Sequence, residues 1–257
     1  MIDIQDVSAL TFGIWLANNT NSDLDFDDLS IKPGGFDVLH VDEAASSCWK
    51  PGDEILLTSW LKDANNRLTA TIESTSDGIL ILNETLAITT LATAAADPRF
   101  AIEVARLTRK VIFEGELDDP TREFLLGGHF IVYQTPQQIQ LLEGVKLVNF
   151  GQQGEKGRYP IHFHLSGSVA GSIVSKNVIY NSNQRCVVVH GSHDLEVIDN
   201  VAFETHGHCF ITEDGIETGN VFTRNLGASI RKPTYVIEGE NDNSPSIFWI
   251  TNPQNTL

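Results

Sequence analysis

The chain has 257 residues and carries 17 Lys and Arg against 34 Asp and Glu, which gives a formal net charge of −17. This excess of negative charge argues against nucleic acids and anionic membrane surfaces as partners, because both repel an acidic protein. Three cysteines are too few for a disulfide scaffold, and no stretch approaches the ~20 consecutive apolar residues of a membrane span, so we expect no membrane insertion by this segment.

The first part of the chain is acidic and rich in turn residues. Residues 1–47 contain "NNTNSDLDFDD" and predict an irregular acidic segment of loops and short strands. The N-terminal stretch has no basic region ahead of its apolar residues, so no signal peptide is expected. Residues 1–144 hold 9 Lys and Arg against 23 Asp and Glu, whereas residues 145–235 hold 8 of each, so the acidity belongs to the N-terminal half.

Strand signals dominate from residue 48 to residue 144. In residues 48–61 a Pro-Gly pair predicts a turn, and an Ile-Leu-Leu run predicts the strand that follows it. Residues 68–86 predict two strands around the sequence Ser-Asp-Gly. Further strands are expected within 104–117 and 127–135, and a short helix is expected at 135–144.

A repeat begins near residue 145. The segments "PIHFHL", "CVVVHG" and "CFITED" start at Pro160, Cys186 and Cys209, with offsets of 26 and 23 residues. Asparagines recur in a second register at offsets of 23 and 25 residues. Short strands with polar corners at a period near 24 residues are typical of the coils of a parallel β-helix. A β-sandwich is the alternative, but its strands would not repeat the same corner chemistry at one period.

The repeated asparagines are Asn177, Asn200 and Asn225. An asparagine at the same corner of successive coils can form a hydrogen-bonded ladder, and it tolerates the left-handed backbone conformation found there. We therefore predict an all-β fold, a parallel β-helix whose coils are clearest from about 145 to 230.

Aligning the three segments places side chains in columns. Ile161 stacks with Val187 and Phe210 on the core face, and the opposite face stacks His164 with His190 and then Glu213. Neighbouring strands lie about 5 Å apart, which suits a divalent cation held by these two histidines and this carboxylate. The same column suits acid–base chemistry, with Glu213 holding or passing a proton beside a histidine.

Asp214 is adjacent to Glu213 and would replace it in the column if the register slipped by one residue. Adjacent strand residues point to opposite faces, so these two carboxylates are not expected to form a pair around one bond. His162 precedes the column on the same face as His164. It can be a structural histidine, and the whole ladder can be structural if each ring bonds its neighbour.

A flanking column contains Tyr159, Arg185 and His208. Cys186 and Cys209 stack on each other, which allows either a pair of buried thiols or a disulfide, and buried thiols are favoured.

Several motifs resemble one known family. The segments "WKPGDEILLTS", "GQQGEKGRYPIHFHLSG", "RCVVVHGSHDLEVIDN" and "GHCFITEDGIE" resemble the β-helix region of the cell-migration-inducing and transmembrane hyaluronidases. Fibrocystin-type proteins that carry G8 domains share this region. The resemblance covers roughly residues 48–257, does not extend to residues 1–45, and lacks a recognisable G8 segment, so the chain looks like part of a larger protein.

The resemblance implies a right-handed parallel β-helix over 48–257, an extracellular or cell-surface setting, and contact with hyaluronan or a similar polysaccharide. The stacking argument then gives roles to the matching positions. Catalytic candidates are His164, His190, Glu213 and Asp214. Substrate-binding candidates are Arg158, His162, Arg185 and His208. A divalent cation, either calcium or zinc, is expected at His164, His190 and Glu213.

Two functions remain open at this point. The chain is either a hyaluronidase-like glycosidase or a non-catalytic glycan-binding or adhesion module, and a monomer is expected in both cases. Because a charge of −17 suits a polyanionic glycan poorly, the basic residues of the neutral half, Arg158 and Arg185 among them, are expected to hold the acid groups of the substrate.

Overall fold

The computed structural model describes residues 12–14, 31–32, 35–41, 47–58, 68–87, 102–116, 125–240 and 242–257. Every regular element in these ranges is a β-strand, which confirms the predicted all-β class. No helix in the described ranges has the length and apolar character needed to cross a membrane. The chain divides into two compact units, Met1–Thr108 and Arg109–Leu257.

The first unit is an antiparallel sheet of seven strands in the order β1-β7-β4-β5-β6-β3-β2. The hairpin predicted around residue 77 is confirmed, because Asp77 and Gly78 adopt positive φ angles of 48° and 80° in the tight turn between β5 and β6. Its strands are β1 (Phe12–Ile14), β2 (Ile31–Lys32), β3 (Gly35–His40), β4 (Glu54–Leu57), β5 (Leu68–Ser76), β6 (Ile79–Ala87) and β7 (Ile102–Arg106).

The strands of residues 54–106 thus lie outside the parallel coils, although the β-helix was expected to start at residue 48. A two-residue hairpin connects antiparallel neighbours, whereas parallel strands need a long crossover. The expected irregular segment 1–47 lies largely outside the described residues, and the described part of it contributes β1, β2 and β3.

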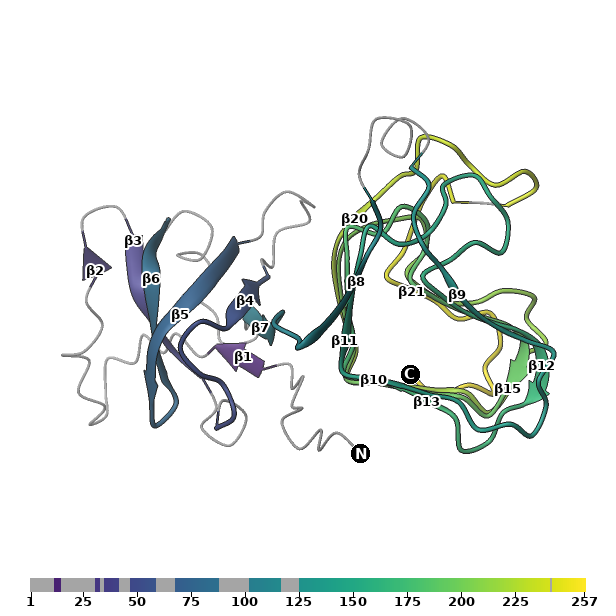
Figure 1. Ribbon diagram of the computed structural model, residues 1–257, viewed down its shortest axis with the longest axis horizontal. Coiled ribbons are helices and arrows are strands. Elements are labelled where there is room, and N and C mark those ends of the chain that lie inside the picture. The colour runs from purple at the N-terminus through teal and green to yellow at the C-terminus, as the bar shows by residue number, and fades with distance from the viewer. Residues whose placement is uncertain are drawn as a thin grey trace. The chain divides into compact units, whose positions relative to one another are not determined.

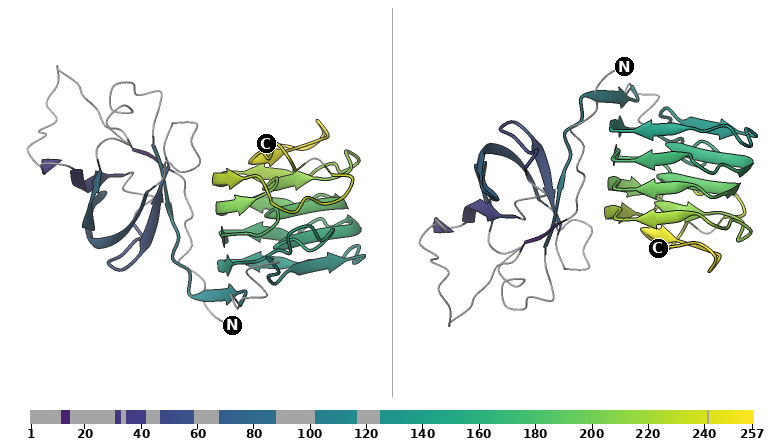
Figure 2. Two further views of the ribbon diagram at one scale, coloured as in Figure 1. Left: turned by 90° about the horizontal axis from the view of Figure 1, so that it is seen from above. Right: turned by 90° about the horizontal axis from the view of Figure 1, so that it is seen from below.

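The second unit is a parallel β-helix with three sheets. Figure 1 views the coils nearly end-on, and Figure 2 shows them stacked as successive layers. The sheet orders are β20-β17-β14-β11-β8, β10-β13-β16-β19 and β21-β18-β15-β12-β9, and every described pair in them is parallel.

The strands of this unit are short, and each forms one side of a coil. They are β8 (Val111–Glu114), β9 (Phe130–Tyr133), β10 (Leu141–Glu143), β11 (Val145–Val148), β12 (Ile161–Ser168), β13 (Ile173–Ser175), β14 (Val178–Tyr180), β15 (Val187–His193), β16 (Glu196–Ile198), β17 (Val201–His206), β18 (Phe210–Thr212), β19 (Val221–Thr223), β20 (Leu226–Arg231) and β21 (Phe248–Trp249).

The prediction of a short helix at 135–144 is wrong. Leu141, Leu142 and Glu143 form β10 and pair in parallel with residues 173–175 of the next coil. Pairing with the neighbouring coil satisfies the backbone groups that a helix would have satisfied internally, so tertiary context overrides the local pattern.

The predicted alignment of the coils is confirmed. Ile161 pairs with Val187, and Val187 pairs with Phe210. These side chains pack in one buried cluster with Phe163 and Val189, so the odd-numbered positions of β12 and β15 face the interior. The alternate positions therefore face outwards, and the histidines are among them.

The asparagine ladder also forms. The side-chain amide of Asn177 donates to the Asn200 oxygen at 3.0 Å, and the amide of Asn200 donates to the Asn225 oxygen at 2.9 Å. Asn200 is fully buried, and its amide also donates to the carbonyl of Val174 at 2.9 Å. The ladder fixes the same corner in three successive coils and satisfies polar groups that would otherwise be buried without partners.

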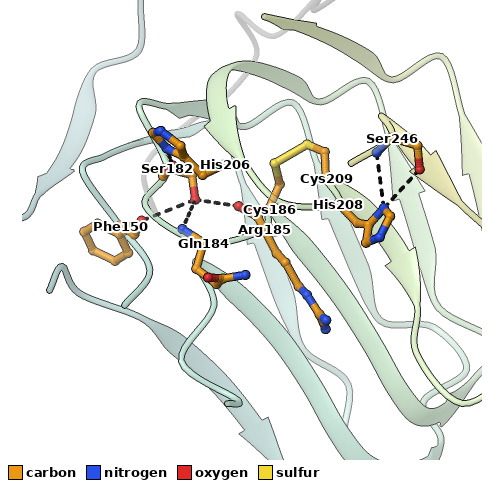
Figure 3. The surroundings of a disulfide bond; sticks show 9 residues. All are labelled: Phe150, Ser182, Gln184, Arg185, Cys186, His206, His208, Cys209 and Ser246. Atoms are coloured by element: carbon orange, nitrogen blue, oxygen red, sulfur yellow. Dashed lines mark hydrogen bonds between the residues drawn. A yellow bond between two sulfur atoms is a disulfide. The ribbon is translucent and has the colours of Figure 1, made fainter. Parts of the chain in front are cut away.

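Cys186 and Cys209 form a disulfide between adjacent coils (Figure 3). The preference for buried thiols was therefore wrong. The pairing of β15 with β18 brings the two Cα atoms to 4.5 Å, a separation within the range that a disulfide spans. The bond links the coil that contains His190 to the coil that leads into Glu213.

Candidate functional site

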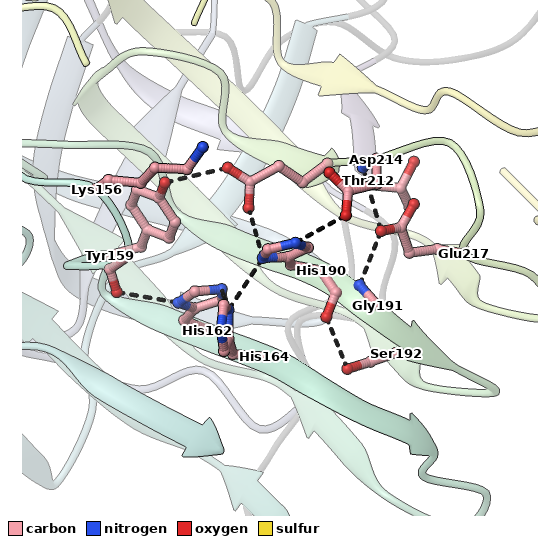
Figure 4. A network of polar contacts seen from close by, with 12 residues as sticks. Lys156, Tyr159, His162, His164, His190, Gly191, Ser192, Thr212, Asp214 and Glu217 are labelled. Atoms are coloured by element: carbon pink, nitrogen blue, oxygen red, sulfur yellow. Dashed lines mark hydrogen bonds and ion pairs between the residues drawn. The ribbon is translucent and has the colours of Figure 1, made fainter. Parts of the chain in front are cut away.

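Three histidines gather on the outer face of the sheet β21-β18-β15-β12-β9. His162 and His164 lie two residues apart on β12, and His190 lies opposite His164 on β15. The rings of His164 and His190 have centroids 4.6 Å apart, and those of His162 and His164 are 4.8 Å apart. The predicted column is thus confirmed for two histidines, and His162 joins them (Figure 4).

The ring nitrogens of the three histidines converge. His164 Nδ1 lies 3.3 Å from His162 Nε2 and 3.0 Å from His190 Nδ1. On its other side, His162 Nδ1 lies 3.0 Å from the carbonyl oxygen of Gly157. Because a carbonyl only accepts, His162 carries its hydrogen on Nδ1 and presents the lone pair of Nε2 to the cluster.

Burial keeps the two histidines of β12 uncharged. His162 is 1% exposed, and its desolvation lowers its pKa to about 3, against an ordinary value of 6.5. Desolvation also lowers the pKa of His164, and positive charge on His190 would lower it further. Both rings of β12 are therefore neutral near pH 7, the form in which imidazole accepts a proton or binds a metal.

Two carboxylates reach His190 from the following coil. Glu213 Oε2 lies 3.3 Å from His190 Nδ1, and Asp214 Oδ2 lies 2.8 Å from His190 Nε2. The expectation that these adjacent acids point to opposite faces is wrong, because β18 ends at Thr212 and the backbone bends through residues 213–215. Once the chain leaves the strand, the strict alternation of side chains no longer applies.

The bend is held by Glu217, a residue that the sequence analysis did not single out. Its fully buried carboxylate accepts hydrogen bonds from the backbone N–H groups of Gly191, Asp214 and Gly215, at 2.9, 3.2 and 2.9 Å. Glu217 thereby ties the carboxylate-bearing bend to β15, next to His190. A glutamate two residues after an Asp-Gly pair is a weak signal for such an anchoring role, so the sequence alone did not reveal it.

The buried Arg185 holds Glu213 in position. Its guanidinium is 1% exposed and donates to Glu213 Oε1 at 2.7 Å and to the hydroxyl oxygen of Tyr159 at 3.2 Å. The Tyr159 hydroxyl in turn donates to the same Glu213 oxygen at 3.2 Å, and burial raises the pKa of Tyr159, which keeps that hydroxyl protonated. Glu213 is thus positioned with one oxygen anchored and the other facing His190.

The opposite end of the Arg185 guanidinium contacts two further acids. Arg185 Nη2 lies 3.3 Å from Glu240 and 3.4 Å from Asp242, whose side chain is fully buried. The expectation that Arg185 holds the acid groups of a substrate does not fit this position, because the guanidinium is buried and already surrounded by carboxylates.

The coils of the second unit match a known protein family. The family described as the CEMIP β-helix matches residues 125–257, more than half of the chain. The chain belongs to the CEMIP β-helix family. This agrees with the resemblance read from the histidine and cysteine motifs, and it places those motifs inside the matched region.

Relatives of this CEMIP β-helix occur in amoebae and vertebrates. The protein rliB of Dictyostelium discoideum is 31% identical over 89% of this chain and 23% of its own length. A human protein named cell surface hyaluronidase CEMIP2 is 30% identical over 82% of this chain and 18% of its own length. The human cell migration-inducing and hyaluronan-binding protein is 34% identical over 60% of this chain and 14% of its own length. The chain therefore spans less than a quarter of the length of each of these relatives.

Two further predicted site residues occupy different environments in this CEMIP β-helix. His208 is 3% exposed and shares a hydrogen bond of 3.1 Å with Ser246. Its ring packs on Trp249, with the two ring centroids 4.4 Å apart. It is therefore buried and occupied by partners within the protein, which does not favour the substrate-binding role expected for it. Arg158 is exposed, and its guanidinium lies 2.8 Å from Nε2 of His129, so it is still available to an acidic ligand.

The donor set of the CEMIP β-helix cluster also differs from the expected one. One ring nitrogen from each of His162, His164 and His190 lies within 4.8 Å of the others, and this is the set of potential metal ligands found among the described residues. Glu213 contacts His190 but does not belong to this set. The arrangement therefore offers either a proton relay through His190 and the carboxylates or a nitrogen-rich cation site.

Proposed function

We propose that this β-helix binds a hyaluronan-like polysaccharide on the exposed part of the outer face of the sheet β21-β18-β15-β12-β9, around Tyr133 and Asp214, and cleaves it at the histidine cluster. The observation that carries the proposal is the contact between His190 and Asp214. The side chain of Asp214 is 47% exposed, whereas that of His190 is 16% exposed. A carboxylate that is open to solvent and touches a partly buried imidazole is suited to proton transfer to a bound substrate.

Exposed aromatic rings on the same sheet support a glycan ligand. Tyr133 pairs with His164, is 54% exposed, and lies almost parallel to the His164 ring at a centroid distance of 5.4 Å. Trp249 pairs with Ile211 at the far edge of the sheet and is 39% exposed. Flat apolar faces of sugar rings pack on such aromatic surfaces while their hydroxyls remain in water.

The two carboxylates have different roles in this proposal. Glu213 is anchored to the buried Arg185 and to Tyr159, so it acts as a fixed hydrogen-bond acceptor beside His190. Asp214 is the exposed group and passes a proton to the glycosidic oxygen as the bond between that oxygen and the sugar carbon breaks, while water adds to the carbon and gives up a proton in return. The exposed Arg158 attracts the acid groups of the glycan in a region where basic and acidic residues balance.

The names of relatives and the disulfide support the setting. Human and zebrafish relatives are named as cell surface hyaluronidases, and another human relative is named as hyaluronan-binding. A disulfide such as Cys186–Cys209 persists in the oxidising environment outside cells. We therefore place the protein outside the cell or at its surface.

A non-catalytic glycan-binding module is the second candidate. It is favoured by the fact that both nitrogens of His190 and both oxygens of Glu213 already have partners within the protein. In that case the cluster stiffens the coils, and the aromatic and basic residues of the surface hold the glycan.

The test is the chain length of hyaluronan and of a neutral polysaccharide after incubation with the protein, together with measured binding. Shortening that is lost in Asp214→Asn but retained in Asp194→Asn supports cleavage at the cluster, since Asp194 is an exposed acid that contacts Ser168 instead. Binding without shortening supports the module. Neither binding nor shortening of any glycan contradicts both candidates.

A further inference from the structure

We propose that His162, His164 and His190 together bind one transition-metal ion of the zinc class. This inference goes beyond glycan binding and does not depend on whether a glycan is cleaved. It rests on the number of protons in the cluster, on the distances between its nitrogens, and on the groups that fix the three rings.

The cluster has too few hydrogens for its contacts. His162 uses its single hydrogen on the Gly157 carbonyl, and His190 uses one on Asp214. His164 Nδ1 lies between two nitrogens, and one atom cannot donate to one neighbour and accept from the other at the same time. When His164 donates from Nδ1 to His162, a hydrogen on His190 Nδ1 serves Glu213 Oε2, and the contact between His164 and His190 is left without a hydrogen bond. A cation between the three nitrogens satisfies all of them.

The distances suit a tetrahedral ion. Zinc–nitrogen bonds of about 2.0–2.1 Å place neighbouring ligand atoms of a tetrahedron about 3.3 Å apart. The contacts of His164 Nδ1 with His162 and His190 measure 3.3 and 3.0 Å, and all three nitrogens fall within 4.8 Å of one another. A cation therefore fits with small movements of side chains rather than of the backbone.

The outward-facing nitrogens have the partners that metal-binding histidines need. His162 donates from Nδ1 to a backbone carbonyl at 3.0 Å, and His190 donates from Nε2 to Asp214 at 2.8 Å. Such partners fix the tautomer and the orientation of a ligating ring. The parallel pairing of β12 with β15 and the stacking of Tyr133 on His164 hold the rings in place.

The chemistry of the donors selects the metal. Three neutral imidazoles suit Zn²⁺, Co²⁺, Ni²⁺ or Cu²⁺, whereas Ca²⁺ takes six or more oxygen ligands. Three protein ligands leave a fourth position for water or an exogenous ligand. Of the two ions expected from the sequence, zinc fits this site, and the third ligand is His162 in place of Glu213.

The experiment is a titration of the metal-free folded protein with Zn²⁺ by calorimetry, and with Co²⁺ followed by its visible absorption, in the absence of any glycan. We expect one ion per chain, tetrahedral-type Co²⁺ bands, and no comparable binding of Ca²⁺. His164→Ala should weaken Zn²⁺ binding by about 100-fold or more, since loss of an orienting partner alone costs about 10–100-fold. His193→Gln, which changes a histidine of β15 that lies outside the cluster, should bind Zn²⁺ as the parent protein does.

Glu213→Gln separates this ligand set from the one that includes a carboxylate, because the three-histidine site should keep one equivalent of Zn²⁺. Circular dichroism confirms that each variant is folded, and His190→Ala provides an independent loss of one ligand. Absence of Zn²⁺ binding, or unchanged affinity in folded His164→Ala and His190→Ala, overturns the proposal. Because no glycan is present, this result is distinct from any failure of polysaccharide binding.

Discussion

His164 and His190 lie opposite each other on adjacent coils, with their Nδ1 atoms 3.0 Å apart. They are separated by 26 residues of sequence, which is one turn of the β-helix at this point. The cluster therefore exists only when the coils are stacked, and its geometry depends on whatever stabilises that stacking. The buried ion pairs, the disulfide and the burial of His162 each lead to a prediction.

Replacing Arg185 by methionine should strongly destabilise the second unit. The substitution leaves the buried carboxylates of Glu213 and Asp242 without their cation, and breaking a buried pair in this way costs about 3–5 kcal/mol. Urea denaturation measures the change. The matched control is Lys156→Met, because Lys156 contacts Glu240 at 2.9 Å but is 61% exposed, and it should cost at most about 1 kcal/mol. Equal effects of the two substitutions would contradict the buried network.

The disulfide should stabilise the coils. Cys186 and Cys209 are 23 residues apart, and closing a loop of this size in the unfolded chain is worth about 3 kcal/mol. The double variant Cys186→Ala/Cys209→Ala should unfold at a lower urea concentration than the oxidised protein. A reducing agent should lower the midpoint of the parent protein and leave the double variant unchanged. A parent protein that does not respond to reduction would show that no such bond supports the fold.

Acid should destabilise the metal-free protein partly through His162. The folded pKa of His162 is about 3, against 6.5 as its ordinary value, so below pH 6.5 the unfolded chain binds a proton that the folded one refuses. The stability that comes from keeping His162 neutral is fully present above pH 6.5. It is lost as the pH falls towards 3, and the free energy of unfolding then decreases by up to about 1.4 kcal/mol per pH unit.

The variant His162→Gln isolates this effect. Its amide can donate to the Gly157 carbonyl but does not titrate. The free energy of unfolding, measured from pH 7 to pH 4 in metal-free buffer, should fall less steeply in His162→Gln than in the parent protein. Parallel curves would mean that His162 is not held in its neutral form by burial.

Exposed aromatic side chains should contribute to glycan affinity. Tyr133→Ala removes a ring that is 54% exposed beside His164, and it should weaken polysaccharide binding by about 2–13-fold with little change in stability, because stacking contacts are worth about 0.5–1.5 kcal/mol. Val111→Ala, at an exposed apolar position on β8 in another sheet, is the control. Isothermal calorimetry with an oligosaccharide measures both, and an unchanged affinity in Tyr133→Ala would remove this ring from the binding surface.

The coils and their register could be predicted from the sequence. The cysteine and asparagine positions repeat at nearly constant offsets, and parallel strands transmit such a repeat directly into columns of stacked side chains. The pairing of His164 with His190 follows from that alignment and is confirmed. The hairpin at Asp77 carried an equally clear local signal, but the residues on either side of it were assigned to the β-helix, and they lie in the antiparallel sheet instead.

The rest of the site could not be read from the repeat. Extending the repeat to Glu213 and Asp214 requires the strand to continue through them, but β18 ends at Thr212, and the bend turns both acids towards His190. The burial of Arg185 depends on carboxylates that lie 55 and 57 residues further along the chain. Long-range contacts of this kind leave no trace in local periodicity.

The most direct test of the proposed glycan site is a crystal structure of the protein with a bound hyaluronan oligosaccharide. We predict sugar density across the outer face of β9, β12 and β15, with one ring against Tyr133 and a glycosidic oxygen within hydrogen-bonding distance of Asp214. Sugar bound on another sheet, with the histidine cluster left in contact with solvent alone, would contradict the assignment of the cluster as the functional site.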